Sequence, residues 1–295
     1  MVVIRNLFLA LWIVLIGGGC SKVEPMGLLV ASSDVKDRLK QSVEFYERDK
    51  KSFMIYPEKK EYSFLVVADS HTTTDLKRLT SFFDEATRAD GNYAFCAHLG
   101  DLAETQSEYY YAVDKLVADY EVGYEDFHFY PVVGNHDITH SGWSLFNMIF
   151  GSSTYFINVC VDENTYDLLV FLDSANGTLG KEQLELVTAF LEDLRNEYRH
   201  CFVFTHNPFF RPRMNAYSSN FPREELYYLY DLFADSEVDY VFSGHIHAHG
   251  EDSFRGVKYI TLDAFGEKET PARGEMARMT CKENGEITYE LVYVP

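Results

Sequence analysis

Polar residues of types that bind metal ions follow five separate apolar runs in the sequence. In chain order these segments are Asp69-Ser70-His71, Gly100-Asp101, Gly134-Asn135-His136-Asp137, Thr205-His206 and Gly244-His245-Ile246-His247. A lone histidine or aspartate at the end of a strand is usually a cap or a surface residue, so each segment alone is a weak signal. All five together, each after an apolar run, indicate one polar site built from distant parts of the chain.

The residue types in these segments suit a pair of divalent or mixed-valence metal ions. Imidazole and carboxylate are ligands for zinc, manganese and iron. Two such ions about 3.5–4 Å apart can hold a phosphoryl group and a hydroxide that attacks it. Because cations so close repel each other, at least one carboxylate is expected to bridge them. The Asp-x-His and His-x-His spacings place both side chains of a pair on one side of an extended loop, where both can reach one ion.

The order of the segments closely resembles the motif pattern of the calcineurin-like metallophosphoesterase superfamily, with every element present within residues 69–247. The resemblance implies that His136 is not a ligand but contacts the phosphate and protonates the leaving oxygen. It implies two sets of metal ligands, which are Asp69, His71 and His247 for one ion and Asn135, His206 and His245 for the other, with Asp101 bridging both.

The elements that must position these segments alternate between apolar strands and amphipathic helices. Strands are predicted at 64–68, 93–99, 127–133, 155–161, 168–172, 201–205 and 239–243. Helices are predicted at 76–86, 105–120, 143–149, 184–194 and 223–234. This alternation, followed by a strand-rich stretch over 257–294, predicts a layered α/β fold with its site at strand carboxyl ends. The family resemblance implies a four-layer α/β/β/α sandwich with the dinuclear site at one sandwich edge.

The charge of the chain limits its partners. A formal net charge of −20 repels polyanions, so nucleic acid is not expected as a partner. Asp69 and Asp101 are the only carboxylates among the proposed ligands, so two dications and one hydroxide would leave the centre at roughly +1 and attractive to phosphate. Histidine is a common general acid in catalysis, which fits the role that the resemblance implies for His136. A phosphate ester is therefore the expected partner.

Four further residues are weaker candidates. Glu104 stands three residues after Asp101, where related phosphatases place an acidic residue that orients the catalytic histidine, and Asp137 could orient neighbouring ligands. Arg211 and Arg213 lie in a long loop after His206 and could grip a phosphate, with surface charge as the alternative. The remaining histidines match no motif position and are interpreted as structural or exposed: His98, His128, His140, His200 and His249. Of these, His140 and His249 flank the site.

The first twenty residues resemble a bacterial lipoprotein signal. Arg5 precedes an apolar run over 7–16, which is too short to span a bilayer, since a spanning helix needs about 20 apolar residues. Small residues then precede Cys20, although Gly17 replaces the aliphatic residue typical of that position. We expect an exported protein that is lipidated at Cys20 and anchored to a membrane, in the periplasm or at the cell surface. Ordinary cleavage and an uncleaved anchor are the alternatives.

Three segments are expected along the chain: a signal peptide over 1–20, a tether with an N-terminal helix over 21–60, and a metallophosphoesterase domain over 61–295. In the helix, Val35, Leu39, Val43 and Tyr46 share one face, and Ser32-Ser33-Asp34 before it can act as a cap.

Hydrolysis of a phosphate monoester or diester by a metal-bridging hydroxide is the first hypothesis for the function. The alternative is a metal-stabilised binding protein on the same fold that has lost catalysis. No expected ligand is missing, which favours the enzyme. The sequence leaves open the substrate, the metal pair, any disulfide and the oligomeric state.

Overall fold

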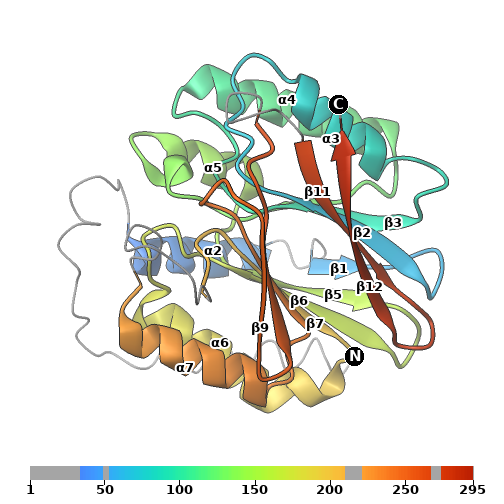
Figure 1. The fold of residues 1–295 in the computed structure, drawn as a ribbon. Helices are drawn as coiled ribbons and strands as arrows, with labels where there is room; N and C mark the ends of the chain where they lie inside the picture. Colours follow the sequence, from blue (N-terminus) through green and yellow to red (C-terminus); the bar gives the residue numbers. More distant parts are fainter. Residues whose placement is uncertain (1–33, 49–52, 210–220, 267–273, 295) are drawn as a thin grey trace.

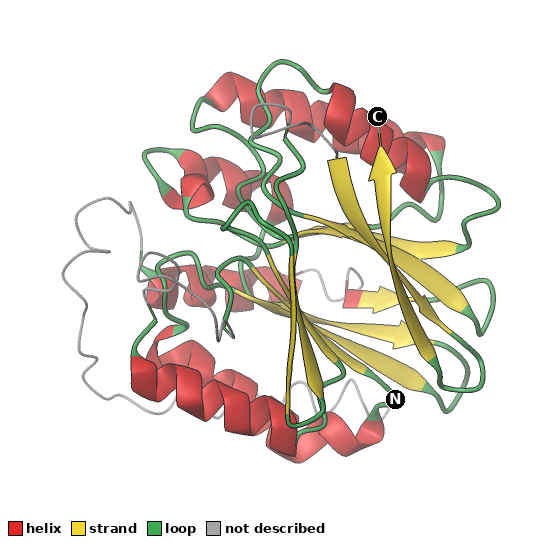
Figure 2. Cartoon of the chain, viewed as in Figure 1, coloured by secondary structure: helices red, strands yellow, loops and turns green. Residues whose placement is uncertain are grey.

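Two β-sheets pack face to face, and helices cover the outer face of each (Figure 1, Figure 2). The structure is a computed structural model that describes residues 34–48, 53–209, 221–266 and 274–294. Within these residues the four layers run helix, sheet, sheet, helix. The predicted α/β sandwich is confirmed.

The larger sheet has seven strands in the order β1-β5-β6-β7-β8-β10-β9. Its central strands β6, β7, β8 and β10 are parallel to one another, so their carboxyl ends meet at one edge. The strands are β1 (Met54–Ile55), β5 (Tyr155–Cys160), β6 (Tyr166–Leu172), β7 (Cys201–Thr205), β8 (Tyr240–Ser243), β9 (Gly250–Phe254) and β10 (Val257–Thr261).

The smaller sheet has five strands in the order β12-β11-β2-β3-β4. Strands β2, β3 and β4 are parallel, so they too end at a common edge. The strands are β2 (Tyr62–Val67), β3 (Tyr93–His98), β4 (Phe129–Pro131), β11 (Gly274–Cys281) and β12 (Ile287–Val294).

Three helices cover each sheet. Those on the larger sheet are α2 (Val35–Arg48), α6 (Gly180–Leu194) and α7 (Arg223–Asp235), and those on the smaller sheet are α3 (Lys77–Ala86), α4 (Ser107–Gly123) and α5 (Gly142–Phe150). Two short 3₁₀ helices, η3 (His136–Ile138) and η4 (Arg195–Glu197), complete the elements of the described residues. None of the described helices has the length and apolar character that crossing a membrane requires.

Most strands consist of continuous apolar residues, because one face of each sheet is covered by the other sheet and the opposite face by helices. In β2, Phe64 and Val66 face the other sheet, whereas Leu65 and Val67 face the helices. Aromatic rings fill the space between the sheets. Phe204 is fully buried there, with its ring centroid 4.6 Å from that of Phe171 and 5.5 Å from that of Phe242.

All the predicted strands and helices are present, with shifted ends. The strand predicted over 127–133 is shorter, at Phe129–Pro131, and the helix predicted over 105–120 ends later, at Gly123. Strands β1 and β9 were not predicted. The first has two residues, and β9 is a polar edge strand whose residues alternate between half-buried and exposed. The first is too short, and the second too polar, to show the apolar pattern by which strands are found.

The predicted N-terminal helix is α2. The Asp37 N–H donates to Asp34 Oδ1 at 2.8 Å, so Asp34 caps the first turn. Val35 and Leu39 are buried, as expected for the apolar face. The expected tether before this helix lies outside the described residues, and the division of the chain at residue 61 stays a prediction.

Four cysteines lie in the described part of the chain, and each is buried with a free thiol: Cys96, Cys160, Cys201 and Cys281. Burial raises the pKa of all four thiols. They are therefore core residues in this structure and form no disulfide among themselves.

Truncation of Phe204 to alanine should destabilise the protein by about 3–5 kcal/mol, because it opens a cavity between the sheets. The free energy of unfolding in urea measures this. Val122→Ala, at a residue that is 90% exposed, is the control and should change little. A loss below about 1 kcal/mol for Phe204→Ala would contradict the inter-sheet position of this ring.

Candidate metal centre

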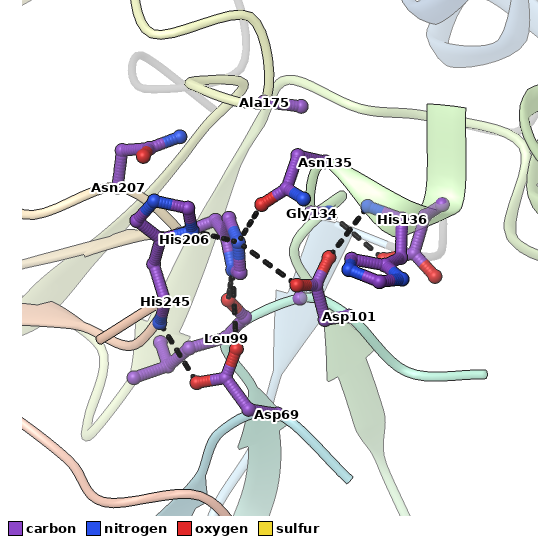
Figure 3. A network of polar contacts seen from close by, with 12 residues as sticks. Asp69, Leu99, Asp101, Gly134, Asn135, His136, Ala175, His206, Asn207 and His245 are labelled. Carbon is purple, nitrogen blue, oxygen red and sulfur yellow. Dashed lines mark hydrogen bonds and ion pairs between the residues drawn. The ribbon is translucent and has the colours of Figure 1, made fainter. Parts of the chain in front are cut away.

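The carboxyl ends of five strands bring the predicted ligands together at one edge of the sandwich. Figure 3 shows Asp69, Asp101, Asn135, His206 and His245 at this edge. The smaller sheet supplies Asp69 and His71 after β2, Asp101 after β3, and Asn135 after β4. The larger sheet supplies three histidines, of which His206 follows β7, and His245 and His247 follow β8. The site is thus divided between the sheets, and its geometry depends on how they pack.

One group consists of Asp69, His71 and His247. Their nearest ligand atoms all lie within 4.8 Å of one another. His71 Nε2 is 3.3 Å from His247 Nε2, and His247 Nε2 is 3.6 Å from Asp69 Oδ1. This is the set expected for the first ion.

A second group surrounds His206. Its Nε2 atom lies 2.9 Å from Asn135 Oδ1, 3.2 Å from His245 Nδ1 and 3.3 Å from Asp101 Oδ2. On the other side of the ring, His206 Nδ1 is 2.8 Å from the Leu99 carbonyl oxygen, to which it donates (Figure 3). That bond leaves Nε2 directed into the site as a potential ligand.

Asp101 lies between the two groups. Its Oδ2 atom is 3.9 Å from His71 Nε2 and 3.3 Å from His206 Nε2. Its other oxygen, Oδ1, accepts a hydrogen bond from the His136 backbone N–H at 2.8 Å. Asp101 therefore has one oxygen fixed by the backbone and one that faces both groups, as a bridging carboxylate would.

Two features of the site fit metal ions better than hydrogen bonds alone. Asp69 Oδ1 is buried and accepts no hydrogen bond among the described residues, although buried carboxylate oxygens are normally bonded. Two pairs of imidazole nitrogens also face each other at 3.2 and 3.3 Å. Two ligand atoms about 2.1 Å from one ion lie roughly 3.0 to 3.4 Å apart. The donor set and its spacing therefore fit two metal ions.

The charges in the protein alone are consistent with a site that binds cations. Burial opposes the charge on Asp101, but His206 and the neighbouring histidines outweigh it and hold the pKa of Asp101 well below its usual range. Burial likewise opposes a charge on His206, yet Asp101 and Asp69 raise its pKa to about 9. Burial lowers the pKa of His245 to about 4. A metal ion must therefore displace a proton from His206, while His245 is already neutral.

Most of the ligand loops adopt a backbone conformation that L-residues rarely take. Positive φ angles occur at Asp69 (52°), His71 (42°), Asp101 (53°), His245 (72°) and His247 (53°). Such conformations cost energy and cluster at functional sites. The turns also need glycine, because a Cβ atom on Gly100 would lie 2.7 Å from Gly134 N and 2.8 Å from His206 Nδ1. The Gly-Asp motif thus allows two loops to approach closely.

His136 and Glu104 lie at the rim of the first group. The His136 ring packs edge-on against the His71 ring at 4.8 Å, and a ligand atom of His136 lies within 4.8 Å of His71 and Asp101. Glu104 Oε1 is 3.8 Å from His71 Nδ1. The described hydrogen bonds include none between Glu104 and His136, and the expectation that Glu104 orients His136 stays a prediction. The role of His136 stays a prediction.

Asp137 joins two of the ligand loops. It is fully buried, and its carboxylate accepts hydrogen bonds from Gly134 N at 2.8 Å, Leu102 N at 3.2 Å and the Tyr110 hydroxyl at 2.6 Å. Burial, together with the charge on Asp101, raises the pKa of Asp137 to about 6. It thereby positions the loops that carry Asp101 and Asn135, in line with the expectation that it orients neighbouring ligands.

His98 holds two other loops together, which the sequence did not predict. Its Nδ1 atom accepts from Gly100 N at 3.2 Å, so Nε2 carries the proton and donates to Ser70 Oγ at 2.8 Å. Ser70 Oγ in turn donates to the Leu102 carbonyl oxygen at 2.7 Å. Burial lowers the pKa of His98 to about 3, so the ring is neutral. The only sequence signal for this role was a histidine in an apolar strand two residues before Gly100.

Ser174 supports the loop that carries His206, and it was also not predicted. Its Oγ atom lies 3.2 Å from His206 N, 2.8 Å from Asn207 N and 2.7 Å from Thr205 Oγ1. Its carbonyl oxygen accepts from Asn207 Nδ2 at 2.6 Å. A serine at a strand end gives no local signal of these bonds, which link positions about thirty residues apart in the chain.

The other predicted residues fall outside this cluster. Cys20, Arg211 and Arg213 lie outside the described residues. His140 is exposed, and His249 contacts Glu275 and Glu251 rather than the site. His128 is half-buried before β4, and His200 is buried before β7, so neither is at the carboxyl edge.

Comparison with known proteins agrees with this geometry. The family model described as calcineurin-like phosphoesterase matches residues 62–249. A dimetal phosphatase from Danio rerio is similar in structure, with a TM-score of 0.51, 16% identity, and coverage of 79% of this chain and 99% of that chain. GAP50, described as the anchor in the inner membrane complex of Plasmodium, has a TM-score of 0.54, 15% identity, and coverage of 79% and 84%. Such identities show a common fold only. The comparison with curated proteins found no significant match.

Purified protein loaded with manganese or zinc should contain about two metal ions per chain. Asp101→Ala should lower this number, because the two cations then lack their shared carboxylate. Metal analysis after chelation and repletion measures both. Asp114→Ala, at an exposed carboxylate on α4, is the control. Wild-type stoichiometry near zero after repletion would contradict the assignment of the site.

Proposed function

The chain belongs to the calcineurin-like phosphoesterase family, and on that premise we propose that it is an enzyme that hydrolyses phosphate esters with two bound metal ions. The observation that carries the proposal is the position of Asp101, with one oxygen between two groups of histidines. A single-ion binding site would not need this arrangement. The substrate class is a phosphate monoester or diester.

The protein supplies positions and charges for this reaction. When bound, the two metal ions would supply Lewis acidity for the phosphoryl oxygens and the hydroxide nucleophile. Asp69, His71 and His247 would hold one ion, and Asn135, His206 and His245 the other. Because the ligands carry few negative charges, the loaded site would attract a phosphate anion in spite of the acidic surface.

His136 is proposed as the general acid. Its backbone N–H donates to Asp101 Oδ1, which keeps the residue beside the bridging carboxylate. Its ring is half-buried and stands edge-on to His71, at the rim of the site. From there the imidazole can contact a bound phosphate and give its proton to the departing oxygen.

A non-catalytic binding protein is the alternative. The structural similarity to GAP50, which is described as an anchor, supports considering it, because a fold does not determine function. The intact ligand set and the presence of His136 favour hydrolysis. The test is a screen of metal-loaded protein against p-nitrophenyl phosphate, bis(p-nitrophenyl) phosphate and unactivated alkyl esters. Metal binding without hydrolysis of any ester would support the alternative.

His136→Ala should leave both metal ions bound and lower turnover by roughly 10²–10⁴-fold on alkyl esters. The loss should be smaller for p-nitrophenyl esters, because their leaving group departs without a proton. Steady-state kinetics and metal analysis on the same sample measure the two effects. His128→Ala, at the amino end of β4, is the control. If His136→Ala instead lost metal and kept its activity per ion, His136 would be a ligand.

We also propose that the protein is exported and held at a membrane by a lipid on Cys20, as the N-terminal sequence suggests. Cys20→Ala should then move the protein from the membrane fraction to the soluble fraction of the producing bacterium. Metabolic labelling with a fatty acid shows whether the wild-type chain carries the lipid. Unchanged fractionation of the variant would contradict lipidation at this residue.

A further inference from the structure

An ion pair with no solvent exposure joins helix α2 to the end of strand β6. The side chains of Arg38 and Asp173 are both 0% exposed. Arg38 Nε donates to Asp173 Oδ2 at 2.7 Å, and its Nη2 atom donates to Asp173 Oδ1 at 3.0 Å and to Asn176 Oδ1. Helix α2 precedes residues 62–249, to which the family model applies. Arg38 therefore lies outside the residues that the family model matches, and Asp173 lies within them.

A buried ion pair needs an explanation, because removing two charges from water often costs more than their attraction returns. Here the guanidinium is held in two-point contact with the carboxylate, which fixes both position and orientation. Arg38 thereby fixes residues 173 and 176 relative to the helix. The pair therefore constrains geometry, whatever its net contribution to stability.

The segment fixed by Arg38 is the one that supports the second metal group. Ser174 follows Asp173 directly, and its hydroxyl oxygen accepts the backbone N–H groups of His206 and Asn207. His206 is the central member of that group. The buried ion pair is therefore connected to His206 through the peptide bond from Asp173 to Ser174 and one hydrogen bond from His206 N to Ser174 Oγ.

Helix α2 also contacts the half of the molecule that carries His136. Gln41 Oε1 accepts from Trp143 Nε1 at 3.2 Å, and the Arg38 guanidinium lies 5.8 Å from the centre of the Trp143 ring. Trp143 belongs to α5, which follows η3 in the chain. Figure 1 shows α2 between α5 and α6. The helix thus links elements on both sides of the divided site.

We propose that α2 is a positioning element of the metal centre, in which Arg38 acts through Asp173 and Ser174 to hold His206. The inference rests on the metal site of the proposed function but not on the reaction or its substrate. It predicts a selective effect on the ion held by Asn135, His206 and His245. General loosening of the protein would affect both ions.

The test measures each ion separately by titrating Mn²⁺ into metal-free, full-length protein. A His71→Ala background retains the His206 group, and a His245→Ala background retains the group of Asp69 and His247. Into each, Arg38→Met is introduced together with Asp173→Asn, so that no buried charge loses its partner. Asparagine keeps an oxygen for the Ala175 N–H, which Asp173 Oδ1 accepts at 3.2 Å.

The expected result is a loss of roughly 10–100-fold in Mn²⁺ affinity in the His71→Ala background and no change in the other. Ser174→Ala should give the same selective loss without touching the ion pair, so the proposal remains testable if the double variant does not fold. Lys36→Met, which breaks an exposed ion pair of the same helix with Glu182, is the control and should change neither affinity.

Equal losses in both backgrounds, or a lower unfolding temperature with both affinities unchanged, would overturn the proposal. Either result would give α2 a purely structural role and leave the proposed function intact. Failure of the wild-type chain to bind any ion would instead overturn the proposed function and this inference together.

Discussion

Packing between the two sheets sets the distance between the two halves of the metal centre. Asp69, His71, Asp101 and Asn135 extend from the smaller sheet, and the three histidine ligands extend from the larger one. Ligand atoms on opposite sheets lie 2.9 Å apart between Asn135 and His206, and 3.3 Å apart between His71 and His247. Such distances hold only if the sheets neither slide nor separate, and the close-packed aromatic rings between them resist both movements. The packing of the core between the sheets therefore helps to determine the geometry of the metal centre.

Charge compensation is the second requirement at this edge. The loops at this edge bury three carboxylates, those of Asp69, Asp101 and Asp137. Buried carboxylates that lie near one another repel because they carry the same charge. Backbone N–H groups and the Tyr110 hydroxyl stabilise Asp137, whereas Asp101 faces imidazoles. Asp69 Oδ1 accepts no hydrogen bond from the part of the chain that the structure describes. The loops therefore place negative charge where only cations can neutralise it.

The sequence pointed to residues that the structure brings together, because each follows a buried strand and parallel strands bring their carboxyl ends together. Their role as metal ligands stays a prediction. The sequence also predicted the layered fold, since apolar runs and helical stripes are local patterns. It did not predict Ser174, Tyr110, His98 or Arg38. These residues act through hydrogen bonds or ion pairs to segments 27 to 135 residues away, and no spacing within a segment encodes such contacts. The left-handed turns at the ligands were likewise invisible without tertiary structure.

The burial of the four thiols has a consequence for how the chain must mature. In the folded protein these cysteines react slowly with oxidants, because burial raises the pKa of each thiol and the reactive thiolate form is scarce. The unfolded chain exposes all of these thiols at ordinary reactivity. If the chain folds in an oxidising compartment, mispaired disulfides can form only before the sheets close. The yield of folded protein in such a compartment depends on the rate of folding relative to the rate of thiol oxidation. A reducing agent present during refolding would therefore favour the native form.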